Sequence, residues 1–147
     1  MFSKATEYAL RAVIYIAQKS TPEKKLGLAE IAKSIDSPPS FTAKILQLLT
    51  ADNSVISSTR GPNGGFYITE KAKKLPVRSV LKVMQEEKVL TKCVIGLKQC
   101  SEIKPCPMHS QYKAIKEQLI KLFEEKTIGD LAKEMGEGNS YINNKSK

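Results

Sequence analysis

The fold is decided by one stretch of the sequence, Val55-Ile56-Ser57-Ser58-Thr59-Arg60-Gly61-Pro62-Asn63-Gly64-Gly65-Phe66-Tyr67-Ile68-Thr69. Residues 55–59 are β-branched or hydroxylated, and residues 60–65 are rich in glycine, with one proline and one asparagine. Residues 66–69 are again aromatic or β-branched. Two short runs of this kind on either side of such a turn predict a β-hairpin.

Three helices are expected before the hairpin. Residues 3–19 predict a long amphipathic helix, because small and apolar side chains recur at helical spacing. The members of this alanine-rich buried face are Ala5, Ala9, Ala12, Val13, Ile16 and Ala17. A short second helix is expected to end near Asp36, and its apolar residues are Leu28, Ile31, Ala32 and Ile35.

The third helix is expected to begin at Ser37-Pro38-Pro39-Ser40. Ser37 is a candidate hydroxyl cap, and prolines are tolerated there because the first turn of a helix leaves its N–H groups unpaired. The buried side is predicted to hold Phe41, Ile45, Leu48 and Leu49. The outer side is predicted to hold Ser40, Thr42, Ala43, Lys44 and Gln47.

The second half of the chain is expected to be helical. A fourth helix is predicted to start near Pro76, and Thr127-Ile-Gly-Asp130 has the spacing of a capping box that opens a last helix. Between them, apolar residues recur with spacings of four and three, which predicts a long helix with a narrow seam suited to a partner subunit. The seam consists of Met108, Tyr112, Ile115, Leu119 and Leu122. An ordinary core helix is the alternative.

The predicted fold class is mainly α with a small β-hairpin: a winged helix-turn-helix DNA-binding domain plus a long dimerisation helix. In that architecture the third helix enters the major groove, and the hairpin, or wing, lies on the backbone or in the minor groove. The expected divisions are residues 1–75 for the DNA-binding domain and 76–136 for a metal-binding loop and dimerisation helices. Residues 137–147 are expected to be a flexible tail.

Composition agrees with a DNA-binding protein of the cytoplasm. The net charge is +9, with 24 Lys and Arg against 15 Asp and Glu, which favours polyanionic partners. No signal peptide is evident, and no apolar run approaches the ~18 residues of a membrane span. The chain has three cysteines, and three cannot all pair with one another. A cytoplasmic protein that binds a metal is therefore expected rather than a disulfide framework.

All the cysteines and the one histidine of the chain fall between residues 93 and 109. Cys93, Cys100 and Cys106 offer three thiolates for an iron–sulfur cluster, one short of a full set of four. With His109 the same residues could instead form a structural Cys3His zinc site. A third reading is three free cysteines. A small metalloenzyme or thiol redox protein is disfavoured, because the sequence has no Cys-x-x-Cys motif and one histidine leaves no base for a nucleophile.

The order of these segments resembles the IscR/NsrR-like family of iron–sulfur cluster-binding winged-helix transcription regulators. The resemblance is carried by Ala9-Leu-Arg-Ala12, Leu28-Ala-Glu-Ile-Ala32, residues 38–47, residues 57–66 and the Cys-x6-Cys-x5-Cys segment. It implies a homodimer that binds a pseudo-palindromic operator and holds a [2Fe-2S] or [4Fe-4S] cluster. It also adds Glu7 to His109 as a candidate fourth ligand, reaching the cluster of the other subunit. The interval between the first two cysteines is often one residue shorter in the family.

The DNA-binding residues are expected on the third helix and the wing. Arg60 can insert its guanidinium into a narrow minor groove from the turn that contains Gly61 and Gly64. The hydroxyl and ammonium groups of the third helix can reach phosphates or base edges; they belong to Ser40, Thr42 and Lys44. Ser57 and Ser58 are candidate phosphate ligands or simply strand residues.

Overall fold

The computed structural model describes residues 1–138 and 140–145. Its elements, in chain order, are α1 (Lys4–Lys19), α2 (Leu28–Ser34), α3 (Pro39–Thr50), β1 (Ser57–Thr59), β2 (Gly65–Tyr67), α4 (Glu70–Lys73), α5 (Arg78–Val83), the 3-10 helix η1 (Glu87–Leu90), α6 (His109–Glu125) and α7 (Ile128–Gly136). This mainly helical chain with one antiparallel hairpin confirms the predicted fold class. The short helices α4 and η1 were not expected from the sequence.

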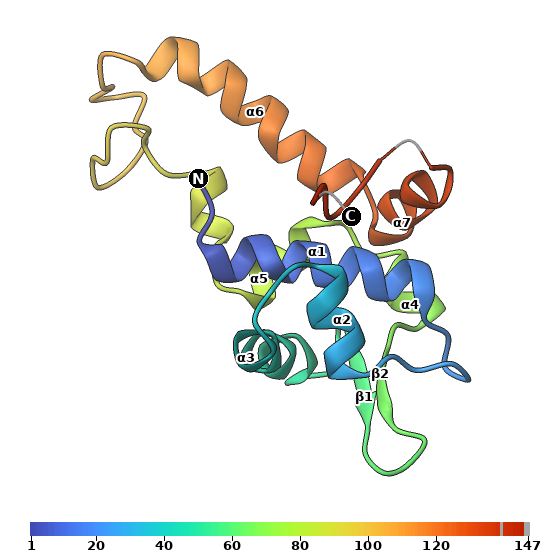
Figure 1. The fold of residues 1–147 in the computed structure, drawn as a ribbon. Coiled ribbons are helices and arrows are strands. Elements are labelled where there is room, and N and C mark those ends of the chain that lie inside the picture. Colours follow the sequence, from blue (N-terminus) through green and yellow to red (C-terminus); the bar gives the residue numbers. More distant parts are fainter. Residues whose placement is uncertain (139, 146–147) are drawn as a thin grey trace.

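Helix α1 lies at the centre of the molecule, against α2, α3, α5 and α7 (Figure 1). Ala9 and Ala12 are fully buried, because their small side chains let neighbouring helices approach closely. Ser3 caps the helix by accepting a hydrogen bond from the Thr6 backbone N–H, which satisfies one of the free N–H groups of the first turn. The alanine-rich face predicted from the sequence is thus the core of the structure.

The turn between α2 and α3 is held by side-chain contacts. The guanidinium of Arg11 donates to the Ile35 carbonyl at 2.9 Å. Asp36 follows with a φ of 55°, a conformation in which Asp is better tolerated than most residues. The expectation that Ser37 caps α3 is wrong, because the N-cap position is held by Pro38 without a side-chain cap. The Ser37 hydroxyl instead accepts a hydrogen bond from Thr42.

Two residues of α3 lie on the opposite side from the one predicted. Thr42 is fully buried, whereas Leu48 is 50% exposed. The buried stripe of α3 is Thr42, Ile45, Leu46 and Leu49, which has the regular spacing of a helix face. The predicted stripe was centred about one residue away, because the sequence prediction placed apolar side chains in the core and the hydroxyl of Thr42 on the surface. Thr42 is tolerated in the core because its single hydroxyl proton faces two acceptors, the Ser37 hydroxyl oxygen at 2.8 Å and the Pro38 carbonyl oxygen at 2.9 Å.

The hairpin pairs Ser57 with Tyr67, Ser58 with Phe66, and Thr59 with Gly65. A third segment lies along it, since Leu26 forms an antiparallel bridge with Phe66. The core side of this sheet packs on the helices through Leu26, Phe66 and Ile68. The base of the wing therefore packs on the helical core, and its turn projects away from the helices (Figure 1).

The second half wraps the other side of α1. The capping box predicted at Thr127 and Asp130 is present at the start of α7, and Ile128 is fully buried. Helix α6 is different, because no residue of it is buried within the described subunit. Figure 1 shows that it runs from the cysteine segment to α7 on the outside of the molecule. Among the described residues, no helix is both long and apolar enough to cross a membrane.

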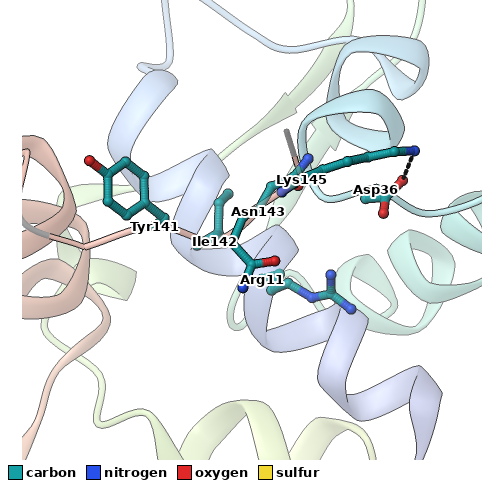
Figure 2. A pocket seen from close by; sticks show the side chains of 7 residues that line it. Arg11, Asp36, Tyr141, Ile142, Asn143 and Lys145 are labelled. Carbon is teal, nitrogen blue, oxygen red and sulfur yellow. Dashed lines mark hydrogen bonds and ion pairs between the residues drawn. The ribbon is translucent and has the colours of Figure 1, made fainter. Parts of the chain in front are cut away.

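Residues 140–145 of the expected tail lie beside α1 and the end of α2 (Figure 2). Ile142 packs against the core, and the Asn143 amide donates to the Ser34 carbonyl at 3.4 Å. The ammonium of Lys145 pairs with Asp36 at 3.3 Å. Residues 139, 146 and 147 of the same segment lie outside the described residues. The tail thus contacts the turn that leads into α3.

Candidate nucleic-acid interface and metal centre

The outer face of α3 offers fewer polar groups than the sequence indicated. Ser40 and Lys44 are exposed and lie one helical turn apart. Thr42 does not share this face, because its hydroxyl is buried against Ser37. The candidate contacts of α3 with DNA are therefore Ser40 and Lys44, and Thr42 is removed from them.

The wing presents Arg60 at the end of β1, where its side chain is exposed. The Gly64 N–H donates to the Gly61 carbonyl at 2.9 Å and closes the turn. A Cβ at residue 64 would meet the Thr59 carbonyl oxygen at 2.3 Å, so only glycine fits there. The two glycines predicted as DNA-binding residues thus shape the turn next to Arg60. Ser58 is exposed beside them, and Ser57 is half-buried.

Cys93 begins the metal-ligand segment and is buried. Hydrogen bonds from the backbone N–H groups of Leu97, Ile95 and Gly96 and from the Cys106 thiol lower the pKa of Cys93, although burial acts in the opposite direction. Backbone N–H groups that converge on a sulfur stabilise its negative charge. The structure therefore brings Cys93 and Cys106 together, 13 positions apart in the sequence.

Cys100 and His109 form a second pair of possible ligands. Their Sγ and Nδ1 atoms lie 3.3 Å apart, and His109 is the first residue of α6. The other ring nitrogen, Nε2, is buried and has no hydrogen-bond partner in the described part of the chain. An imidazole with one buried nitrogen left unpaired costs free energy unless a ligand takes that position.

One ion pair and one hydrogen bond attach the loop to α6. Glu102 accepts a hydrogen bond from Lys113, which lowers the pKa of the carboxyl and raises that of the ammonium. The ammonium of Lys116 donates to the Thr91 carbonyl at 3.1 Å, just before Cys93. The middle of the segment from Cys93 to His109 and the residues just before it are thus attached to α6.

Within residues 1–138 and 140–145, no three His, Cys, Asp or Glu side chains stand together as a metal-binding group. The predicted ligands form two pairs instead, Cys93 with Cys106 and Cys100 with His109. Three thiols and an imidazole with an unpaired nitrogen, all within one segment, are the types of ligand that hold an iron–sulfur cluster or zinc. Glu7 is exposed on α1, 3.9 Å from the ammonium of Lys4, and belongs to neither pair.

Glu86 is a residue that the sequence did not single out. Its carboxylate accepts hydrogen bonds from the Ser3 N–H at 3.0 Å, from the Ser3 hydroxyl and from the buried Thr6 hydroxyl at 2.5 Å. It therefore joins the start of α1 to the segment that leads into Cys93. No local pattern could reveal this contact, because its partners lie 80 or more positions away.

Two relatives align with most of the chain. A putative helix-turn-helix-type transcriptional regulator of Aquifex aeolicus is 29% identical over 133 residues, which cover 89% of this chain and 90% of the relative. The helix-turn-helix-type transcriptional regulator NsrR of Oceanobacillus iheyensis is 28% identical over 131 residues, which cover 88% of each.

Solved structures support the fold. CymR, described as the global cysteine regulator of B. subtilis, superposes with a TM-score of 0.71 at 17% identity, covering 91% of this chain and 97% of CymR. IscR of T. potens superposes with a TM-score of 0.69 at 17% identity, covering 95% of this chain and 91% of IscR. At 17% identity the two structures support the fold of this chain and not its function.

The sequence profile of the Rrf2 family, described as iron-dependent transcriptional regulators, matches residues 2–134. That match includes the helix-turn-helix, the wing, the cysteine segment, α6 and most of α7. A metal or thiol redox protein without a DNA-binding role, the alternative raised by the cysteines, does not account for it. The chain belongs to the Rrf2 family and is a winged-helix transcriptional regulator, not an enzyme.

Proposed function

We propose that this regulator acts in the cytoplasm as a homodimer and binds a pseudo-palindromic operator under the control of an iron–sulfur cluster. The observation that carries the proposal is the segment between residues 93 and 109, which holds three free thiols and an imidazole that lies 3.3 Å from Cys100 and whose Nε2 has no partner in the described chain. The resemblance to the IscR/NsrR-like regulators supports an iron–sulfur cluster over zinc.

Cys93, Cys100 and Cys106 would hold the cluster, and His109 is the favoured fourth ligand. When bound, such a cluster supplies a redox- and nitric-oxide-sensitive group. The chain contributes N–H groups that stabilise charge on Cys93 and a braced loop that keeps the other donors near α6. A histidine ligand binds less strongly than thiolate and can be protonated or displaced, which suits a sensor.

The proposed dimer forms through α6. Ile115 is 62% exposed and Leu122 is 53% exposed in the subunit, although both belong to the apolar seam. At the C-terminal end of the seam, Leu122 lines a cavity of about 200 Å³ together with Leu10, Ile14 and Phe123. A second copy of α6 would cover this surface and would place two α3 helices on one duplex.

The decisive experiment is anaerobic purification with cluster-assembly support, followed by absorption spectroscopy and iron and sulfide analysis. We expect iron and sulfide in equal amounts and visible absorption, and we expect each Cys→Ser variant to lose most of both. Stoichiometric zinc without sulfide would support a structural Cys3His site instead. Metal-free protein with three reactive thiols would contradict both assignments.

DNA binding is tested with an operator selected from random duplexes. Arg60→Ala should weaken binding more at A/T-rich flanks than elsewhere, because a narrow minor groove attracts a guanidinium most strongly. The affinity of the loaded protein should differ from that of the protein after cluster removal. Equal affinities would show that the cluster does not control DNA binding. An Arg60→Ala variant that binds DNA as tightly as wild type would contradict the role of Arg60 in the minor groove.

A further inference from the structure

The segment before α2 is joined to the edge of the wing by one antiparallel bridge. Leu26 and Phe66 exchange two backbone hydrogen bonds, each 2.8 Å long. A Cβ on Gly65, which has a φ of 144°, would meet the Leu26 carbonyl oxygen at 2.6 Å. Glycine at this position therefore lets the two backbones approach. The lateral order is α3, β1, β2 and then this segment, so it lies on the far side of the wing from α3 (Figure 1).

A tight turn sets the position of Lys24. Thr21 and Lys24 exchange two backbone hydrogen bonds of 3.0 Å, and the Lys24 N–H also donates to the Thr21 hydroxyl at 2.8 Å. Lys24 is exposed. Because these hydrogen bonds already order the Lys24 backbone, binding a ligand would cost only the conformational entropy of its side chain.

Lys25 lies along β2. Its ammonium is 5.4 Å from the centre of the Tyr67 ring, within the range of a cation–π contact. Because Leu26 opposes Phe66, the antiparallel register places Lys25 opposite Tyr67, which in turn opposes Ser57. Lys25, Tyr67 and Ser57 therefore share the face of the wing that points away from the core.

The charges of this segment are not neutralised by ion pairs. Among the residues that the structure describes, Lys24 and Lys25 make no ion pair, whereas Lys73 pairs with Glu70. Glu23 in the same turn is exposed and makes no described ion pair either. Together with Lys19 at the end of α1, the segment carries three positive charges against one negative charge.

We infer that Lys24 and Lys25 form a phosphate-binding edge of the wing, which contacts the backbone of duplex DNA beyond the groove reached by Arg60. The inference rests on the proposed DNA-binding role of the wing. A wing in the minor groove has one sugar–phosphate strand on the α3 side and one on the other side. Two cations on that other side, one of them on an ordered backbone turn and one against the Tyr67 ring, match the second strand. They add sequence-independent affinity and widen the footprint on each half-site.

The test compares Lys24→Gln/Lys25→Gln with a matched control, Lys88→Gln/Lys133→Gln, which removes the same charge at exposed lysines in η1 and α7. Operator affinity is measured over a range of salt concentrations, and thermal melting checks that both variants are folded. The slope of log affinity against log salt should become shallower by about 0.9 for each phosphate contact removed, alike for operator and unrelated duplex. The control should keep the wild-type slope, and Lys24→Arg/Lys25→Arg should restore it.

Hydroxyl-radical footprinting gives an independent readout, because backbone protection should disappear only at the outer flanks of each half-site. A double Gln variant with the slope and footprint of the control would overturn the inference. The proposed function would still hold in that case, provided that the wild type binds duplex DNA and that Arg60→Ala weakens this binding. Failure of the wild type to bind any duplex would overturn both.

Discussion

Thr42 shows how one side chain can be assigned to the wrong role. Its hydroxyl is buried and bonded to Ser37 and Pro38, so it stabilises the entry into α3. Thr42→Val should lower the free energy of unfolding by about 1 kcal/mol, because the partner hydroxyl of Ser37 loses its bond. Chemical denaturation measures this effect. The folded Thr42→Val protein should bind the operator as wild type does, whereas Lys44→Gln should bind more weakly. If Thr42→Val bound the operator more weakly than Lys44→Gln, Thr42 would have to be counted among the DNA-binding residues.

The fourth ligand is also decided at the residue scale. His109 lies 3.3 Å from Cys100 and has a free Nε2 in the described chain, whereas Glu7 is exposed on α1. His109→Ala should therefore alter the absorption spectrum of the anaerobic protein and speed the loss of its iron, and Glu7→Ala should not. A changed spectrum in Glu7→Ala alone would favour a ligand that reaches from the partner subunit. Unchanged spectra in both variants would exclude both ligands.

Among the elements, α6 has the least support from its own subunit. Its seam is apolar yet exposed, so a charge at Ile115 should break the dimer without unfolding the subunit. Ile115→Glu should sediment as a monomer at micromolar concentration and should keep the melting profile of a folded protein. Lys121→Glu places the same charge on the opposite side of α6 and should remain dimeric. A monomeric wild type, or a dimeric Ile115→Glu variant, would contradict the seam.

At the scale of the whole molecule, Glu86 ties α1 to the segment that leads into the cysteines. Burial raises the pKa of Glu86, but hydrogen bonds from Ser3 and Thr6 outweigh it and hold the pKa below its usual value. A carboxyl whose pKa is depressed on folding adds stability above its unfolded pKa, and that stability is lost as the pH falls through the folded pKa. Glu86→Gln should therefore destabilise the protein by about 1 kcal/mol near pH 7.

The difference between Glu86→Gln and wild type should shrink as the pH falls below the ordinary pKa of a carboxyl and through the lower pKa of folded Glu86. Denaturant titrations from pH 3 to pH 7 measure this trend. Glu23→Gln is the control, since that carboxylate is exposed and makes no described ion pair. A constant difference across the range would mean that the charge of Glu86 does not strengthen its contacts with α1.

Local patterns in the sequence predicted the hairpin, the other helices and their order, but not the short helices α4 and η1. The glycine turn at residues 60–65 predicted the hairpin, the alanine spacing predicted α1, and Thr127 with Asp130 predicted the start of α7. Each of these signals acts within a few residues, through backbone geometry or side-chain periodicity. The cysteine segment likewise identified its candidate ligands, because ligand chemistry depends on residue type.

Tertiary packing decided what these patterns left open. The burial of Thr42 depends on which side of α3 meets the core, and a hydroxyl is admitted there only because Pro38 and Ser37 can bond it. The pairing of Cys93 with Cys106, and of Cys100 with His109, depends on how the loop closes on α6. The contact of Glu86 with Ser3 and the position of Lys25 beside Tyr67 join segments more than 40 positions apart. Sequence periodicity reports on neighbours along a helix or strand, so contacts between distant segments appear only when the chain is folded.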